Sequence, residues 1–297
     1  MPLHWEYSQS KIASLVGTSP PEFYSPPLNL WYKGKSGGST PYGQQALAYL
    51  AVGGSAGGFT PSAVEAAYWA LYSPSGPGAG GAATGWYLDA STRMFIANEQ
   101  AGRHYPSCGG EDTQADAAAH AVIVTALLGG NTSLLLDTLE PVIRVTQDTP
   151  EAAAFGSAAA RLFERILIYN YTSGAAAVAD TVADLRDAAR HHPYAQDAAL
   201  ADAMEAAVQA AQSGEGSAAF ILRTGQSCDY PFTLPNVAFL TSVLSNTDFV
   251  SGARQNVRAA LPVLGGGAAL PLTQHLTLSF LHPPPHPLPC RPDFSGG

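Results

Sequence analysis

The sequence predicts an all-α fold. Segments with apolar residues at helical spacing follow one another through most of the 297-residue chain, and several of them open with residue pairs that start helices. No segment shows the alternation of apolar and polar residues that indicates a strand. Abundant small residues suit the close packing of helices, and no heptad repeat predicts a coiled coil.

The first expected helices follow a segment of another kind. Residues 1–43 are rich in Pro, Gly and aromatic residues, so we expect either an ordered loop with tight turns or disorder. Residues 44–52 have helical character. The next helix is expected over residues 59–72, with Thr60 as the N-cap and Pro61 at the first helical position.

Two more helices are expected in the middle of the chain. One covers residues 113–128 and ends at Gly129, a residue type favoured just past the last helical turn. The other begins at Asn131 or Thr132, both of which are N-cap residues. Pro141 is expected to kink or break this second helix, because proline lacks the backbone N–H and clashes with the preceding turn.

A further helix is expected from Thr149. Phe155, Ala159, Leu162 and Ile166 fall at spacings that place them on one face of this helix, so we expect all four to face the core.

The remaining helical segments lie in the second half of the chain. Residues 175–190 and 196–212 predict a helical hairpin around Pro193. Residues 233–245 and 247–260 predict two more helices.

The helical period ends near Leu261. We expect residues 261–297, which contain a dense Pro cluster, to form a disordered or loosely docked tail. The sequence therefore predicts one helical domain over residues 1–260.

Charge and cysteine content restrict the possible partners and compartment. The formal net charge is −9, which argues against non-specific binding to nucleic acid or an anionic membrane. Three widely spaced cysteines fit a reducing compartment better than a disulfide framework. The N-terminal residues do not form a secretory signal, and no apolar run reaches the ~18 residues of a membrane span. The cytosol is the default expectation.

A group of acidic and amide side chains precedes the helix over residues 113–128. Glu111, Asp112, Gln114 and Asp116 follow a Gly pair at 109–110. They could cap the helix and offset its dipole. They could also form a site for a cation or a polyhydroxy ligand, since the glycines would let the backbone approach a ligand closely.

Two other patterns carry less information. The sequence around Ser55 matches the G-x-S-x-G nucleophile elbow, but the elbow needs a preceding strand, so we expect a flexible loop between helices. His191 and His192 are neighbours in the chain and should point to different faces of a helix, so we expect no metal chelate from them.

Six segments, in this order along the chain, resemble the ADP-ribosylglycohydrolase family. The likeness is closest to the branch that includes certain lens crystallins, and it extends from Met1 to about Ala260. The segments read MPLHWEY, TPYGQQAL, GWYLDASTRMFI, YPSCGGEDTQADAAAHA, IRVTQDTPEAAAFGSAAARLFERIL and GQSCDYPFTLPNVAFLTSVLSNTDFVSGARQNVRA.

The resemblance implies an all-α fold with a binuclear Mg²⁺ site. It also implies hydrolysis of ADP-ribose linkages or related N- and O-glycosidic bonds. Two Mg²⁺ ions require hard oxygen ligands, mostly carboxylates, together with water. The metals would position and polarise the ribose, while a carboxylate or metal-bound water would supply the base.

The family takes its metal ligands from three stretches, and this sequence departs from each. One stretch is a Thr-Asp-Asp-Thr turn, or Gly-Asp-Gln-Thr in the crystallin-like branch, where this chain reads Gly43-Gln44-Gln45-Ala46. A neutral amide compensates less charge than a carboxylate, so the affinity for metal should fall steeply. Mg²⁺ is therefore doubtful in this chain.

The other two stretches are an upstream Gly-Asp segment and a Gly-Gly-Asp segment after the Asn-x-Arg-Ala helix. Neither occurs before Met1 or after Ala259. We therefore expect the helical domain to be incomplete at both ends, with Met1 as an internal methionine and the tail read from an intron or a shifted frame.

The resemblance also suggests where a ligand would bind. The region corresponding to the acidic and amide group lies beside the family's ligand cleft, and a Val-Thr-Gln segment matches at the next helix junction. The ligand-binding candidates are Glu111, Asp112, Gln114, Asp116, Thr146 and Gln147.

Three functions remain open from the sequence. The first is an ADP-ribosyl hydrolase. The second is a pseudoenzyme of the same fold, acting as a non-catalytic structural protein or as a binder of ADP-ribose or of an ADP-ribosylated small molecule or protein. The third is an unstable fragment with no function of its own. We expect a family member whose catalysis is impaired or absent.

Overall fold

The computed structural model describes residues 11, 14, 15, 39–55, 58–81, 86–169, 171, 173–187, 191–225 and 227–243. Within these ranges the chain is helical and has no strand, only isolated bridges that pair Gly110 with Gln147 and Gln114 with Asp229. The predicted all-α fold is confirmed.

The helices run along the chain with short connections between them. Their bounds are α2 Pro41–Gly53, α3 Pro61–Tyr72, α4 Ala90–Gln100, α5 Asp116–Leu128, α6 Thr132–Ile143, α7 Pro150–Ile168, α8 Gly174–Arg186, α9 Asp197–Gln212, α10 Ser217–Thr224 and α11 Tyr230–Val243.

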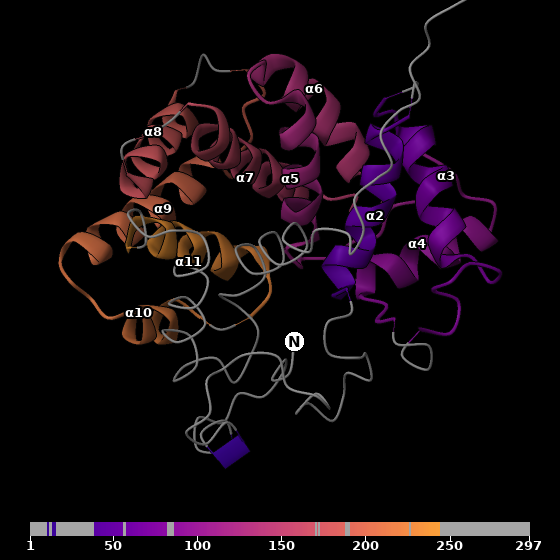
Figure 1. Ribbon diagram of the computed structural model, residues 1–297, viewed down its shortest axis with the longest axis horizontal. Coiled ribbons are helices and arrows are strands. Elements are labelled where there is room, and N and C mark those ends of the chain that lie inside the picture. Colours follow the sequence, from indigo (N-terminus) through magenta and orange to yellow (C-terminus); the bar gives the residue numbers. More distant parts are fainter. Residues whose placement is uncertain are drawn as a thin grey trace, which may run out of the picture.

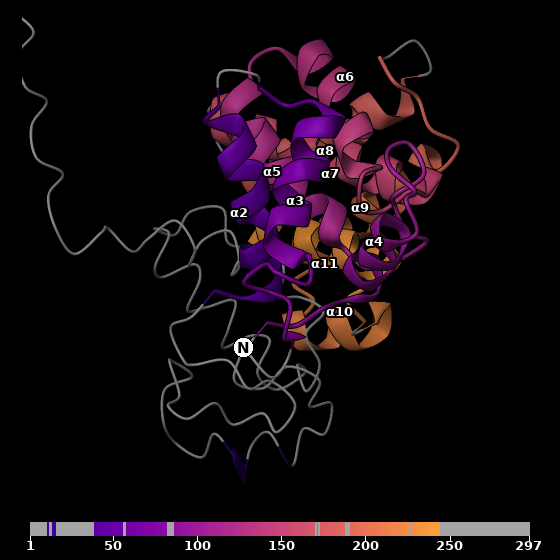
Figure 2. The ribbon, with the colours of Figure 1, turned by 90° about the vertical axis from the view of Figure 1, so that its right-hand side faces the viewer.

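Helices α5 and α7 lie between two groups of helices (Figures 1 and 2). Helix α5 packs against α2, α6 and α7, and α2 carries α3 beside it. Helix α7 packs against α8, while α9 and α11 pack closely against each other. The candidate site lies at the first turns of α2, α4 and α5. Of these helices, α2 and α5 pack against each other, and α5 also packs against α6 and α7.

Local capping explains where several helices begin. Thr60, Asn131 and Thr149 each accept a hydrogen bond on the side-chain oxygen from the backbone N–H three residues later, which satisfies a donor that the helix leaves unpaired. These three starts confirm the predicted ones. Pro61 occupies the first position of α3 and costs no hydrogen bond there.

Two features of the helices differ from what the sequence predicts, while a kink at Pro141 stays a prediction. Pro141 does not break α6, which continues to Ile143. Proline removes one backbone hydrogen bond there, but Val142 and Ile143 beyond it are fully buried and hold the last turn against the core. Ile166 does not face the core with Phe155, because it lies near the end of α7 and is exposed.

Other boundaries shift by a few residues or were not foreseen. The helix predicted over 113–128 begins at Asp116, and the predicted hairpin corresponds to α8 and α9. Helices α4 and α10 were not predicted. The helix expected over 247–260, the tail over 261–297 and residues 1–10 and 16–38 of the N-terminal segment lie outside the described residues, so these expectations stay predictions.

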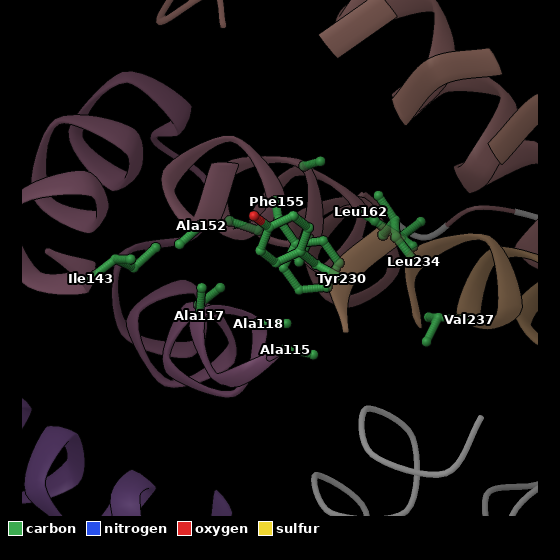
Figure 3. Close-up of a cluster of buried hydrophobic side chains, with 14 of the residues drawn as sticks. Ala115, Ala117, Ala118, Ile143, Ala152, Phe155, Leu162, Tyr230, Leu234 and Val237 are labelled. Atoms are coloured by element: carbon green, nitrogen blue, oxygen red, sulfur yellow. The ribbon is translucent and has the colours of Figure 1, made fainter. Parts of the chain in front are cut away.

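Small residues on α5 allow aromatic rings to reach the centre of the core (Figure 3). Ala117 and Ala118 are fully buried, and beside them the rings of Phe155 and Tyr230 lie 5.6 Å apart. Gly156 allows α7 to approach closely, because a Cβ there would stand 2.3 Å from Cδ1 of Ile143. The alanine-rich composition therefore serves helix packing.

None of the described helices combines the length and apolar character needed to cross a membrane.

Replacing Phe155 with Ala should lower the free energy of unfolding by about 3–5 kcal/mol, because it removes a fully buried ring and leaves a cavity between α5, α7 and α11. The matched control is Ile166→Ala on the same helix, where the exposed side chain should change stability by less than about 0.5 kcal/mol. Chemical denaturation of both variants measures the difference. Equal losses would contradict the placement of the core.

Candidate functional site

Three carboxylates converge at the first turns of two helices. Asp89 is the N-cap of α4, Asp112 lies in the segment that leads into α5, and Asp116 is the first residue of α5. One carboxylate oxygen from each lies within 4.8 Å of the others. All three side chains are buried, and Asp116 is fully inaccessible to solvent.

The backbone positions two of these acids. Asp89 accepts a hydrogen bond from the Thr92 amide at 2.8 Å, as an N-cap does. Asp112 accepts from the Ser91 amide at 3.0 Å and from the Gln114 amide at 3.2 Å. Asp112 therefore ties the segment before α5 to the first turn of α4.

The group has too few hydrogen-bond donors for its acceptors. The Ser91 hydroxyl lies 2.9 Å from Oδ1 of Asp89 and 2.9 Å from Oδ2 of Asp116. A hydroxyl carries one hydrogen, so it can donate to only one of these carboxylates at a time. Oδ1 of Asp116 is buried and has no hydrogen-bond partner within the described part of the chain. A buried acceptor without a partner normally costs about 1–3 kcal/mol.

Among the described residues, the ion pairs of Arg and His that can be traced all go to carboxylates other than Asp89, Asp112 and Asp116. Burial raises the pKa of the Asp89 carboxyl, and the neighbouring Asp112 raises it further. Burial raises the pKa of Asp116 well above its usual value, with added repulsion from Asp89 and Asp112. The site therefore favours anything that brings positive charge.

The first turn of α2 closes one side of the group. Thr40 caps this turn through the Gly43 amide, and the side-chain amide of Gln45 donates to Oδ2 of Asp89. The side-chain oxygens of Gln44 and Gln45 are both buried, and neither has a hydrogen-bond partner among the residues that the structure describes. Burial raises the pKa of the Tyr42 phenol, and the Asp116 charge adds to this effect. The structure therefore brings Gln45 of the predicted degenerate turn to the acids.

Ala46, the last residue of that turn, is partly buried and packs against the hydrophobic core. Its methyl side chain has no polar atom to offer a ligand.

The other predicted ligand-binding residues differ in their surroundings. Glu111 is exposed, and no hydrogen bond links it to the rest of the described chain. The backbone of Gln114 bridges to Asp229, and its side-chain oxygen lies 3.9 Å from Sγ of Cys228. Thr146 is fully buried, and its hydroxyl lies 3.4 Å from the carbonyl of Ile143.

Gln147 holds the chain together at this junction. Its side-chain oxygen accepts from the Ala117 amide at 2.8 Å, and its side-chain nitrogen donates to the Gln114 carbonyl at 2.8 Å. Both polar ends of the side chain are thereby used on the backbone at the start of α5. Gln147 therefore orients the segment that carries Asp112 and Asp116.

The capping alternative for the acidic and amide group does not describe the start of α5. The N-cap of α5 is Ala115, whose side chain makes no capping hydrogen bond, and the Ala117 amide in the first turn donates to Gln147 instead of to the acidic group. The Gly pair is explained by the chain's own packing. A Cβ on Gly109 would lie 2.3 Å from the Arg144 carbonyl, and one on Gly110 would lie 2.6 Å from Cβ of Met94.

A buried histidine lies one turn along α5 from Asp116. His120 stacks on Tyr49 of α2, with ring centroids 4.2 Å apart, and neither of its ring nitrogens has a hydrogen-bond partner. Burial lowers the pKa of His120 to about 3, so the ring is neutral at physiological pH. It joins α2 to α5 beneath the acids.

Sequence reasoning missed Asp89, Ser91 and His120. The run Asp-Ala-Ser-Thr at 89–92 carries a helix-start signal, with an N-cap residue before a helical segment. That signal would have found α4 but not the second role of Asp89 in the acidic group. By contrast, Ser55 lies in the turn after α2 and donates to the Val52 carbonyl at 2.7 Å, as expected of a loop residue.

The side-chain oxygens of the acidic group are of the kind that a hard divalent cation prefers as ligands. Mg²⁺ and Ca²⁺ take carboxylate and amide oxygens together with water, and the group offers carboxylates of Asp89, Asp112 and Asp116 beside the unpaired oxygen of Gln45. Imidazole and thiolate, which favour transition metals, are not among the side chains that form the group.

Comparison with known proteins gives one match. The model of a family described as ADP-ribosylglycohydrolase matches residues 1–262, a range that contains the whole acidic group. No curated protein matches the chain. The match confirms the resemblance drawn from the six sequence segments, while the likeness to the crystallin-containing branch stays a prediction.

Replacing His120 with Phe should reduce the loss of stability in acid. Because the folded-state pKa is about 3 and the unfolded value is about 6.5, the contribution of His120 is fully present above about pH 6.5 and falls by about 1.4 kcal/mol per pH unit as the pH drops toward 3. Chemical denaturation at pH 7 and pH 5 measures the free energy of unfolding. Between these pH values the wild type should lose about 2 kcal/mol more than the His120→Phe variant.

His104→Gln is the matched control, with the opposite sign. The hydrogen bond to Glu65 and the charge of Glu99 raise the pKa of the exposed His104, so its contribution is present below its unfolded pKa and is lost as the pH rises. Removing it should weaken the protein more at pH 5 than at pH 7. An unchanged pH dependence in His120→Phe would show that the His120 ring takes up its proton in the folded protein.

Proposed function

This chain belongs to the ADP-ribosylglycohydrolase family, and on that basis we propose that it binds ADP-ribose or an ADP-ribosylated molecule through a divalent cation beside Asp89, Asp112 and Asp116. We further propose that its hydrolysis of the glycosidic bond is impaired. The observation that carries the proposal is the buried oxygen of Asp116, which has no hydrogen-bond partner among the described residues and lies in a group of three acids.

A cation at this position would remove a real energetic cost. Two buried carboxylates compete for the hydrogen of Ser91, and they repel each other in surroundings of low polarity. A family that acts on ADP-ribose linkages must hold a negatively charged diphosphate and a ribose. Acidic side chains can bind a diphosphate only through an intervening positive charge, which makes the cation and the ligand interdependent.

Each residue has a distinct part in this arrangement. Asp116 and Asp89 would supply carboxylate oxygens, while Ser91 sets their orientation through its hydroxyl. Asp112 is held by the Ser91 and Gln114 amides and would contribute a third oxygen. When bound, a divalent cation polarises the ribose and lowers the pKa of a coordinated water.

The impairment is inferred from the first turn of α2. The family places aspartates in the matching turn, and this chain has Gln44 and Gln45. Gln45 already donates to Asp89, so it acts as a hydrogen-bond donor toward the acids. An amide oxygen brings no negative charge, so it holds a cation more weakly than a carboxylate does. Binding without rapid turnover is the function that this composition favours.

A fully active hydrolase is the second candidate, and one observation favours it. The three carboxylates form a group with enough oxygens to bind one Mg²⁺ without help from α2. Turnover measurements separate this candidate from a binder.

ADP-ribose should bind to the full chain in Mg²⁺, and the affinity should fall at least about tenfold when EDTA removes the metal. Isothermal titration calorimetry measures both states. Asp116→Asn should weaken binding to a similar extent, because the amide keeps the shape of the side chain and removes one negative charge. Glu111→Gln is the matched control, since Glu111 is exposed and lies outside the acidic group.

Turnover of an ADP-ribosylated substrate should stay well below ordinary enzyme rates of about 1–10³ s⁻¹ in the same buffer. Ordinary rates that disappear with EDTA would establish the active hydrolase and contradict the impairment. ADP-ribose binding that is insensitive to both EDTA and Asp116→Asn would contradict the cation-dependent site.

Gln44→Asp should raise the affinity for Mg²⁺ and lower the melting temperature in EDTA, because it adds a carboxylate at a buried position next to Gln45. Calorimetry and thermal melts with and without Mg²⁺ measure the two effects. Gln44→Asn is the matched control of the same size without charge. An aspartate variant with the same Mg²⁺ affinity as the asparagine variant would show that Gln44 does not adjoin the cation.

A further inference from the structure

A second group of metal-ligating side chains lies on the surface, away from the acidic group. Asp137 projects from α6, while His191 and His192 lie in the connection between α8 and α9. The Nε2 atoms of His191 and His192 lie 2.9 Å and 2.7 Å from the same Oδ1 atom of Asp137. Glu140, one turn along α6, has an oxygen 3.7 Å from Nδ1 of His192.

This convergence contradicts the prediction that the adjacent histidines diverge. They do not lie on a helix, since α8 ends at Arg186. His192 has a φ of +52°, in the left-handed region, and no other non-glycine residue of the described chain has a positive φ. The two rings stand nearly perpendicular, with centroids 4.4 Å apart. The turned backbone brings both ring tips to one oxygen.

The connection is held in place from inside the protein. Arg161 of α7 is almost completely buried, and its guanidinium donates to Asp184 of α8 and to the His191 carbonyl. A buried guanidinium is costly to leave unpaired, so these contacts fix where His191 lies. Tyr194 adds a hydrogen bond from its hydroxyl to Glu140 at 2.8 Å. The position of the two histidines is therefore set by the fold.

The two hydrogen bonds leave part of the Asp137 carboxylate unused. A carboxylate has two oxygens that can each accept more than one hydrogen bond. Both imidazoles nevertheless point at Oδ1 of Asp137, while Oδ2 makes no hydrogen bond with the described residues. Asp137 is exposed, so an ion can reach its carboxylate from solvent.

We propose that Asp137, His191 and His192 form a binding site for a transition-metal ion such as Zn²⁺. Two imidazole nitrogens and one carboxylate oxygen are ligands typical of Zn²⁺, and three protein ligands leave one position open for water. Around a tetrahedral ion the donor atoms would stand about 3.3 Å apart. The two distances from Nε2 to Oδ1 of Asp137 need to lengthen by only about half an ångström to reach that spacing, and all three donor atoms already lie within 4.8 Å of one another.

The ion would join α6 to the connection between α8 and α9. These parts of the chain are more than 50 residues apart in sequence, so the ligands come together only in the folded chain, and a bound ion would stabilise the fold. The site is distinct from the buried acids in its chemistry, because nitrogen ligands select against Mg²⁺. It is independent of the proposed ADP-ribose function.

The test is a titration of the full chain with Zn²⁺ in excess Mg²⁺, which occupies oxygen-ligand sites. We expect one Zn²⁺ to bind and to raise the melting temperature by about 2–4 °C. Asp137→Asn and His192→Gln should each weaken binding at least about tenfold. The asparagine keeps an oxygen for both histidines, so this variant tests the charge with little change of shape. Substituting Co²⁺ should give the visible absorption of a site with nitrogen ligands.

Two controls locate the bound ion. His104→Gln removes a described histidine bonded to Glu65 and Glu99, and a double variant His282→Asn and His286→Asn removes two histidines of the Pro-rich segment. Zn²⁺ binding should persist in both. Loss of binding in either control would overturn the proposal, as would wild-type affinity in Asp137→Asn. Absence of Zn²⁺ binding to the wild type would show that the two histidines are only hydrogen-bonded to Asp137.

Discussion

The shared hydrogen of Ser91 is the constraint on which the candidate site depends. One hydroxyl stands between Asp89 and Asp116, and the amide of the same residue holds Asp112. A single residue at the start of α4 therefore positions three acids from two helices and a connecting segment. Because the hydroxyl can satisfy only one carboxylate at a time, the group keeps a deficit of positive charge that the rest of the fold must tolerate.

The apolar core next to the acids offsets the cost of holding these carboxylates together. Helix α5 carries Asp116 at its first residue and is buried over most of its length, so its position is fixed by apolar contacts with α2, α6 and α7. Gln147 ties the backbone before and after Asp116 through both ends of its amide. Burial of this kind can hold like charges together at a cost of a few kcal/mol, which is the condition for a site prepared for a cation.

The sequence predicts the helices better than the site, for a physical reason. Caps such as Thr60 and Thr149 act within three residues, so local reading finds them. Asp112 and Asp116 are close in sequence and were predicted as members of one group with Glu111 and Gln114. Asp89 lies beside them because Ser91 donates to Asp112, a residue 21 positions later in the sequence. A local sequence pattern does not reveal a contact at that separation. The prediction for His191 and His192 was wrong because it assumed a helix. His192 has a left-handed backbone conformation, which lets both rings point to the same atom.

The amides of α2 gain a physical meaning beside these acids. Three carboxylates already exceed the charge of one divalent ion, and a fourth buried negative charge would raise the cost of the metal-free state further. Gln45 lowers that cost, because its side-chain nitrogen donates to Asp89, which a carboxylate could not do. An amide on α2 thus lowers the affinity for a metal ion and raises the stability of the fold without one. An amide at this position therefore suits a fold that must persist without an ion beside the acids.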